Sequence, residues 1–393
     1  MDRDTKNELH LLDSLLKDLK YCIFNSSRDF FSSLDEKKKD EICKYAAEQN
    51  TGNVLYYYHK DKLPEKWQDI FSQEFISSSA RELHRSHDLK ELLSAFGKMN
   101  IDVALLKGND VAYRAYVHPG LRMMGDIDVL VKKNNVEKAY NYLLDKGYVQ
   151  TNEAPHPYHK PALRSKRGNY IELHYHIMHD QTKVTEDVIW EDSSQSKLFE
   201  EKVIFLSPEI ALLHTIQHAM RDKLVCGLKV FLDTAYIIRS LQPDQGKLLD
   251  ISKRSGLYDH YRIFMNIYPG FFPDDYKLLI EPADVKIIKD ARLLIENFPL
   301  LRDLSNQELA FGHSFASSTL KEKMRFIMKS IFKNRATIAY KYNSENKFPE
   351  IYYWYAVSIF EGTMKFFKYL TRNRKDDIKK QIGQAQKSIT ELV

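Results

Sequence analysis

Two aspartates stand inside an otherwise apolar run, LRMMGDIDVLV, at residues 121–131. Aspartate is disfavoured in strands and a buried carboxylate without a partner is costly, so Asp126 and Asp128 need a compensating group. Side chains alternate between the faces of a strand, so both carboxylates point one way while Ile127 and Val129 point the other. Two carboxylates this close repel each other unless a cation lies between them. The spacing therefore predicts a cation site.

Carboxylate oxygens in a pair suit Mg²⁺ bound together with the phosphates of a nucleotide, and Mn²⁺ is the alternative ion. A centre of two metal ions, about 3.5–4 Å apart, requires at least one further carboxylate. Glu172 in the segment YIELHYHI is the first candidate, because strand periodicity puts it on one face with His174. Asp180 and Asp187 are the alternatives if the register of that strand differs.

The phosphates of a nucleotide also need hydrogen-bond donors and positive charge. Gly108 lies at a predicted strand-to-helix junction, where backbone N–H groups and the helix dipole can receive an anion. Lys107 and Arg122 flank the same edge and can neutralise a triphosphate. Asn109 and Gly125 complete the predicted nucleotide-binding set.

The elements that would position these residues can be read from the pattern of apolar residues. Leucines at helical spacing predict helices over residues 7–24 and 63–98. Short apolar runs and turn residues then predict strands between about residues 100 and 205, including a hairpin at Ser165 to Asn169. Beyond that point the chain is again helical in pattern, with a helix start at Ser207 and Pro208.

These features predict an α+β protein with a small mixed β-sheet between two helical regions. The expected ranges are 1–98 for the N-terminal helical region, 99–206 for the core that carries the predicted nucleotide site and 207–393 for the C-terminal helical region. The change from helix to strand near residue 100 and the helix start near residue 207 set these limits.

The composition is ordinary for a globular protein, and the net charge of +5 on 393 residues does not by itself indicate nucleic-acid binding. The three cysteines are far apart and show no paired spacing, which argues against a disulfide framework or a cysteine-based zinc site. The charged N-terminal segment does not have the pattern of a signal peptide, and no window is apolar enough for a membrane span. A cytoplasmic location is expected.

The order of the motifs resembles a known superfamily. LLKG at 105–108, then LRMMGDIDVLV, then IELH, is similar to the polymerase-β-like nucleotidyltransferases, with a glycine at a strand end and an Asp-x-Asp pair on the next strand. More narrowly, the string from LLKG to LRMMGDIDVLV resembles an uncharacterised bacterial nucleotidyltransferase family. The resemblance covers about residues 100–240.

The resemblance implies that Asp126 and Asp128 bind metal, that Glu172 is the third carboxylate and that Gly108 lies beside the phosphates. It also implies transfer of a nucleoside monophosphate from a nucleoside triphosphate to an unidentified acceptor hydroxyl, with release of pyrophosphate. The chain departs from the superfamily at the first junction, where Lys107-Gly108-Asn109 replaces the usual Gly-Ser or Gly-Gly.

Other interpretations remain open. A catalytically silent nucleotide-binding or antitoxin-like protein could keep the same fold, and a purely helical interaction scaffold would bind no nucleotide. His174, His176 and His179 with Asp180 could belong to a metal-dependent hydrolase. His214 and His218 share a face of a predicted helix, but packing explains their spacing without a metal. The acceptor, whether small molecule, protein or RNA, could bind the aromatic segment 348–370 and the basic segment 321–335.

Overall fold

In a computed structural model of the chain, the described residues are 16–24, 30–151, 157–177, 185–224, 226–272, 280–297, 356–357, 359 and 376–390. The chain divides into two compact units, Met1–Asp284 and Val285–Val393. As the sequence predicts, the fold is α+β, with a mixed sheet that is preceded and followed by helices along the chain. The sheet and all the predicted site residues belong to the first unit.

Within the described residues, the strands form one seven-stranded mixed sheet in the order β3-β4-β5-β2-β1-β7-β6. β2 is parallel to β5 and antiparallel to β1, and β1 is parallel to β7. The outer pairs, β3 with β4, β4 with β5 and β6 with β7, are antiparallel. The strands are β1 (Ala104–Leu105), β2 (Asp126–Leu130), β3 (Val149–Gln150), β4 (Leu163–Arg164), β5 (Tyr170–His174), β6 (Ser194–Leu198) and β7 (Glu201–Phe205).

Helices come before, within and after the strands. Those before the sheet are α2 (Phe30–Ser33), α3 (Glu36–Glu48), α4 (Gly52–His59) and α5 (Glu65–Lys98). Those between strands are α6 (Lys107–Arg114), α7 (Val136–Asp145) and α8 (Glu186–Trp190). Those after it are α9 (Pro208–Arg221), α10 (Lys229–Leu241), α11 (Gln245–Arg254) and α12 (Tyr258–Ile267), and the second unit has α13 (Val285–Glu296) packed on α19 (Asp376–Thr390). Short 3₁₀ turns are η1 (Lys60–Lys62), η2 (Pro119–Leu121), η3 (Lys133–Asn135) and η4 (Pro269–Phe271).

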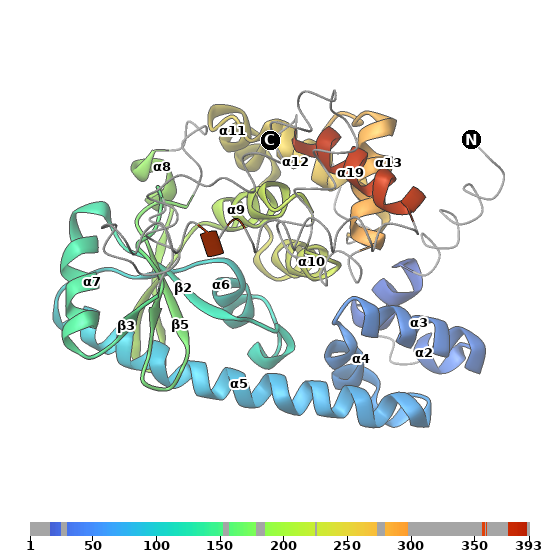
Figure 1. The fold of residues 1–393 in the computed structure, drawn as a ribbon, viewed down its shortest axis with the longest axis horizontal. Coiled ribbons are helices and arrows are strands. Elements are labelled where there is room, and N and C mark those ends of the chain that lie inside the picture. Colours follow the sequence, from blue (N-terminus) through green and yellow to red (C-terminus); the bar gives the residue numbers. More distant parts are fainter. Residues whose placement is uncertain are drawn as a thin grey trace. The chain divides into compact units, whose positions relative to one another are not determined.

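The long helix α5 connects the N-terminal helices to the sheet. It begins after Pro64, which cannot donate a backbone hydrogen bond and is therefore tolerated at a helix start. Figure 1 shows α5, in light blue, running from α4 to the sheet. Its C-terminal half buries Leu89, Leu92, Leu93 and Phe96 in the main core, so this helix fixes one face of the sheet.

Strand periodicity separates the core from the predicted site. Ile127 and Val129 of β2 and Ile171 and Leu173 of β5 are fully buried together with apolar residues of α5 and α7. Burying each such side chain stabilises the fold by roughly 1.5–3 kcal/mol, so the register of these strands is strongly determined. The alternate side chains, the carboxylates included, necessarily point to the other face, as predicted.

Several local signals act as the sequence predicts. Gly147 ends the turn after α7 with φ +86°, and Gly168 turns the β4–β5 hairpin with φ +88°. Both values lie in the left-handed region that favours glycine. Ser207 caps α9, accepting a hydrogen bond from the backbone N–H of Ile210, and Pro208 occupies the first helical position.

Some sequence predictions fall outside the described residues. Of the helix expected over residues 7–24, residues 16–24 are described and are helical. The basic segment 321–335 and nearly all of the aromatic segment 348–370 lie outside the described ranges. In the part of the chain that the structure describes, none of the helices has the length and apolar character that crossing a membrane requires.

Candidate active site

The pairing of β2 with β5 creates the candidate site. In their parallel register Asp128 lies opposite Glu172, and Asp126 lies opposite Tyr170. Asp128 is buried, with 2% of its surface exposed, whereas Glu172 and Asp126 are half-buried. Two carboxylates on adjacent strands and one face are thereby brought together from segments that are distant in sequence.

The ammonium group of Lys107 binds both of these carboxylates. Its Nζ lies 2.5 Å from Oδ1 of Asp128 and 3.2 Å from Oε2 of Glu172. Lys107 reaches them from the first residue of α6, where its φ of +51° places a non-glycine residue in the left-handed region. Such a conformation is unfavourable by roughly 1–2 kcal/mol, and backbone strain of this kind is concentrated at functional sites.

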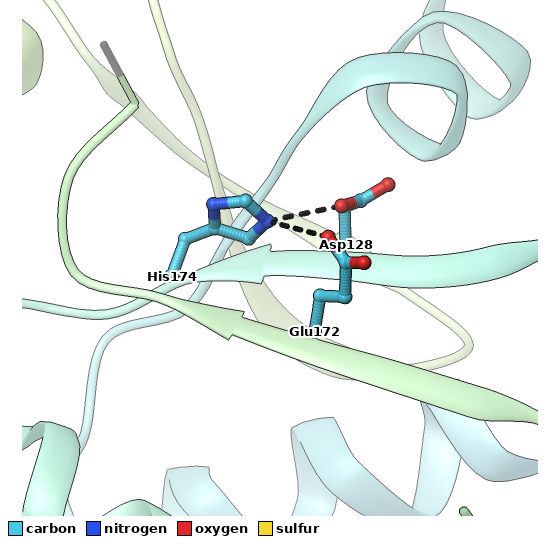
Figure 2. A group of neighbouring side chains, drawn as sticks. All are labelled: Asp128, Glu172 and His174. Carbon is cyan, nitrogen blue, oxygen red and sulfur yellow. Dashed lines mark hydrogen bonds and ion pairs between the residues drawn. The ribbon is translucent and has the colours of Figure 1, made fainter. Parts of the chain in front are cut away.

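His174, the last residue of β5, joins the same group. Its Nε2 lies 3.0 Å from Oδ1 of Asp128 and 3.3 Å from Oε2 of Glu172 (Figure 2). Because both neighbours are carboxylates, this nitrogen carries the proton and donates. The buried Nδ1 has no hydrogen-bond partner among the described residues. We call Lys107, Asp126, Asp128, Glu172 and His174 the acidic cluster.

Electrostatics within the acidic cluster differ from one carboxylate to the next. The charge of Asp128 and then burial raise the pKa of Asp126 to about 7. Burial acts in the same direction on Glu172, but the hydrogen bond from His174 and the charge of Lys107 outweigh it and hold the pKa of Glu172 well below its usual range. Burial opposes the charged form of Lys107, yet Asp128 and Glu172 raise the pKa of that ammonium. The cluster therefore has a surplus of negative charge that one ammonium does not balance.

The donor set fits a divalent cation. One ligand atom each from Asp128, Glu172 and His174 lies within 4.8 Å of the other two, which is close enough for a single ion to contact all three. Two carboxylates suit Mg²⁺, and an added imidazole also suits Mn²⁺. Lys107 already binds the oxygens concerned, which is direct evidence that this position attracts positive charge. Asp126, on the same strand face, lies beside this set rather than within it.

Gly108 and Arg122 lie against each other. A Cβ atom added to Gly108 would lie 3.2 Å from Cζ and from Nη2 of Arg122, and 3.1 Å from Cγ of Met124. A side chain at this position would have to displace the guanidinium or Met124 by a few tenths of an ångström. Arg122 is itself buried and forms an ion pair with Asp233 of α10, with Nε lying 2.7 Å from Oδ1 and 2.9 Å from Oδ2.

The remaining predicted nucleotide-binding residues have different surroundings. Asn109 is buried, and its side-chain amide donates to the backbone carbonyl of Asp126 over 3.2 Å, which ties α6 to β2. Gly125 has no atom within 4 Å of the position that a Cβ would take. Of the alternatives to Glu172, Asp187 lies in α8 outside the acidic cluster, and Asp180 lies outside the described residues.

The loop that leads into β2 is held by residues that sequence reasoning did not identify. Arg85 of α5 donates to the carbonyl of Met124 over 2.6 Å while it pairs with the buried Glu82. Asn53 donates to the carbonyl of Leu121 over 2.9 Å. Together with the Arg122–Asp233 pair, these contacts form what we call the anchor network, which fixes the approach to Asp126.

Apart from Arg122, which the sequence analysis identified, only one member of the anchor network had a signal in the sequence. Asp233 is an acid inside an apolar run, VFLDTAYII, which is the same kind of anomaly that draws attention to Asp126. Glu82 and Arg85, spaced three residues apart on a helix, look like an ordinary solvent-exposed pair. Asn53 offers no signal at all.

Two histidines of α9 border the site in an uncharged form. Burial is the main cause that holds the pKa of His214 and of His218 well below the usual range, and the charge of Lys107 acts in the same direction. His214 is buried inside the unit, whereas His218 is half-buried and lies 3.2 Å from Asp222. Neither contributes to the group of potential metal ligands found among the described residues.

A mixed sheet with a glycine at a strand-to-helix junction, followed by paired acids on adjacent strands, has the organisation of a nucleotidyltransferase. Comparison with protein families agrees: the model of an uncharacterised nucleotidyltransferase family matches residues 35–273, more than half of the chain. The chain belongs to this family and is a transferase of the nucleotidyl-transfer class. No curated protein and no solved structure matches the chain.

The family match extends beyond the sheet on both sides along the chain. It begins at Asp35, the N-cap of α3, and ends just after η4. The match therefore includes α3 to α5 and α9 to α12 as well as the sheet, but not α2. The helices that contribute Arg85, Asn53 and Asp233 lie inside the matched region.

Proposed function

We propose that the protein transfers a nucleoside monophosphate from a nucleoside triphosphate to a hydroxyl group of an acceptor, in the manner of polymerase-β-like enzymes. The observation that carries this proposal is the register of β2 and β5, which places Asp128 beside Glu172 and puts Asp126 on the same face. Membership of a nucleotidyltransferase family supports the reaction class.

The reaction is an in-line exchange of one phosphorus–oxygen bond for another. The acceptor oxygen forms a bond to the α-phosphorus while the bond from that phosphorus to the bridging oxygen breaks. Pyrophosphate leaves with the electron pair of the broken bond, and the proton of the acceptor passes to water. Magnesium, when bound by Asp126, Asp128 and Glu172, supplies charge stabilisation and makes the acceptor hydroxyl more acidic.

The protein's own residues supply position and charge. Asp128 is held between Lys107 and His174, so its carboxylate has a defined orientation. Asn109 and Arg85 hold the backbone on either side of Gly125, which keeps Asp126 in place. Preorganised groups of this kind stabilise a transition state because they need no rearrangement during the reaction.

Binding and transfer experiments test the proposal. ATP, GTP, CTP and UTP are titrated by calorimetry with and without Mg²⁺, and transfer is followed with nucleotides labelled at the α-phosphate, using candidate acceptors and the protein itself. We expect Mg²⁺-dependent binding of at least one nucleotide in the wild type and its loss in Asp128→Asn. Asp102→Asn is the matched control, because Asp102 forms an exposed ion pair with Lys202 away from the cluster.

The same experiment separates the competing functions. Nucleotide binding without transfer to any acceptor would favour a catalytically silent nucleotide-binding protein, in which Lys107 stays on the carboxylates. A metal-dependent hydrolase built around His174 would retain its activity in Asp126→Asn and lose it in His174→Ala. If no nucleotide binds in the presence of Mg²⁺ and activity is indifferent to Asp128→Asn, the proposed reaction is wrong.

A further inference from the structure

Lys229, the first residue of α10, is a cation close to the site for which the described residues supply no ion-pair partner. Among the described residues, its ammonium group forms neither an ion pair nor a hydrogen bond. It is half-buried, so water solvates it only in part. Of the charged groups that act on it, Arg122 opposes its charged form most strongly, while Asp233 and, more weakly, Asp126 favour it.

Asp233 is the carboxylate best placed along α10 to pair with Lys229, but it is bound to other groups. Asp233 is one helical turn further along α10, at the spacing that allows an ion pair on the same face. Both of its carboxylate oxygens accept from Nε of Arg122, and Oδ1 also accepts from the hydroxyl of Tyr116 over 2.9 Å. Asp233 is therefore engaged by Arg122 and Tyr116, and among the described residues it forms no direct ion pair with Lys229.

The position of Lys229 beside another cation is electrostatically unfavourable in the free protein. The positive charge of Arg122, followed by burial, lowers the pKa of Lys229. A partly buried charge is normally paired, because an unpaired one loses solvation without gaining an attraction. An anion bound at this position would supply the missing partner.

The neighbouring groups indicate which part of a substrate such an anion would be. Arg122 packs its guanidinium over Gly108 at the start of α6, next to the acidic cluster. Its Nε and Nη1 are occupied by Asp233 and by the carbonyl of Met123, while Nη2 lies over Gly108. Asp126 interacts electrostatically both with the carboxylates that suit a metal ion and with the cations Arg122 and Lys229. A nucleoside triphosphate has the same polarity, with a metal-binding region and a highly anionic tail.

We propose that Lys229, assisted by Arg122, binds the terminal phosphates of the nucleotide and holds the pyrophosphate as it leaves. This inference rests on the proposed nucleotidyl transfer and assigns the triphosphate site to the start of α10, in addition to the Lys107-Gly108 junction. Lys229 is a binding residue for the leaving group. Its ammonium acts as a point charge that a phosphate oxygen can contact.

Affinity measurements with ligands of different phosphate number test this assignment. Calorimetry compares a nucleoside triphosphate, the monophosphate of the same nucleoside and inorganic tripolyphosphate on the wild type and on Lys229→Met. We expect Lys229→Met to weaken binding of the triphosphate and of tripolyphosphate by about tenfold, and to leave the monophosphate within about twofold, because a single charge-assisted contact is lost. Lys229→Arg should restore most of the affinity for the two polyphosphates.

A matched control and a stability measurement separate binding from structure. Lys247→Met also removes a lysine from the first turn of a helix, α11, but Lys247 pairs with Asp192 at an exposed position. It should leave all three affinities unchanged. Thermal unfolding of Lys229→Met should show a melting temperature equal to or above that of the wild type, because a repulsion with Arg122 is removed. A purely structural lysine would lower it.

The outcomes distinguish the two proposals. If folded Lys229→Met binds all three ligands equally more weakly, or binds none of them more weakly, the assignment of Lys229 is wrong. The proposal of nucleotidyl transfer would be unaffected. Nucleotide binding that is indifferent to Mg²⁺ and to Asp128→Asn would overturn the proposed function, whatever Lys229→Met does to tripolyphosphate. The selective loss of polyphosphate affinity, with Mg²⁺-dependent binding in the wild type, supports both.

Discussion

The acidic cluster and the anchor network are two groups of buried charge in one unit, but they are built on different principles. In the anchor network each charge has a committed partner: Arg122 pairs with Asp233, and Arg85 pairs with Glu82. In the acidic cluster the carboxylates outnumber the single ammonium of Lys107. A closed network stabilises one conformation, whereas an unbalanced one retains affinity for further charge. We therefore expect the acidic cluster to bind ligand and the anchor network to be mainly structural, with Arg122 as the member that also faces the proposed phosphate site.

The largest effect is expected from Asp128→Asn, which removes the carboxylate that Lys107 and His174 both contact. We expect nucleotidyl transfer to fall by a factor on the order of 10³ or more, since the site loses charge that acts on the transition state. Rates are measured with the acceptor found by labelling. The variant should remain folded, because the side chain keeps its shape. A rate equal to that of Asp102→Asn would remove the acidic cluster from the mechanism.

In contrast to Asp128→Asn, the main effect of Asp233→Asn should be on the stability of the fold. Arg122 would be left buried without a compensating charge, and breaking a buried ion pair in this way costs roughly 3–5 kcal/mol. Urea unfolding monitored by circular dichroism measures the loss. Asp222→Asn is the control: its contacts with Arg221 and His218 are more exposed, so a loss of about 1 kcal/mol or less is expected. Similar losses in both variants would show that Arg122 does not depend on Asp233.

Lys107→Met tests whether the acidic cluster attracts cations. Without the ammonium, Asp128 and Glu172 repel each other, and we expect a loss of about 1–3 kcal/mol in the metal-free protein, as for other hydrogen bonds between charged groups. Added Mg²⁺ should then raise the melting temperature of the variant more than that of the wild type. Lys202→Met, which removes an exposed lysine, should show the wild-type response. An absent or smaller response in Lys107→Met would contradict a metal site there.

The smallest effect concerns the backbone of Lys107. Lys107→Ala and Lys107→Gly both remove the ammonium, but only glycine adopts φ +51° without strain. The free energy of unfolding of Lys107→Gly should therefore exceed that of Lys107→Ala by about 1 kcal/mol. The greater flexibility of glycine in the unfolded chain reduces this difference. Chemical denaturation of the two variants side by side gives the difference. A more stable alanine variant would mean that the left-handed conformation is not kept in solution.

Much of the fold could be predicted because local signals and burial agree in this chain. Alternation on β2 and β5 placed Ile127 and Leu173 in the core and their acidic neighbours on the other face, and this is confirmed. Ser207 at the start of α9 and Gly147 after α7 also act as predicted. Such signals depend on φ and ψ preferences and on nearby hydrogen bonds, which are properties of a short segment.

The candidate site was predictable only in part. The types and order of Asp126, Asp128 and Glu172 could be read, but their assignment as catalytic residues stays a prediction. Strand periodicity placed His174 on the face of Glu172, but its contact with Asp128 of the neighbouring strand was not predicted, because it depends on the pairing of β2 with β5. The pairing of Arg122 with Asp233 joins residues 111 positions apart, and no local pattern encodes it.

The sequence by itself determined the elements, their faces and the order in which the acidic and basic residues appear, because these follow from side-chain periodicity and backbone preferences within a few residues. Only the tertiary structure decided which strand lies beside β2, that Lys107 reaches two carboxylates, and that Asp233 pairs with Arg122 rather than with Lys229. Charge balance is the physical reason. It depends on distances through space between distant segments, and those distances exist only when the chain has folded.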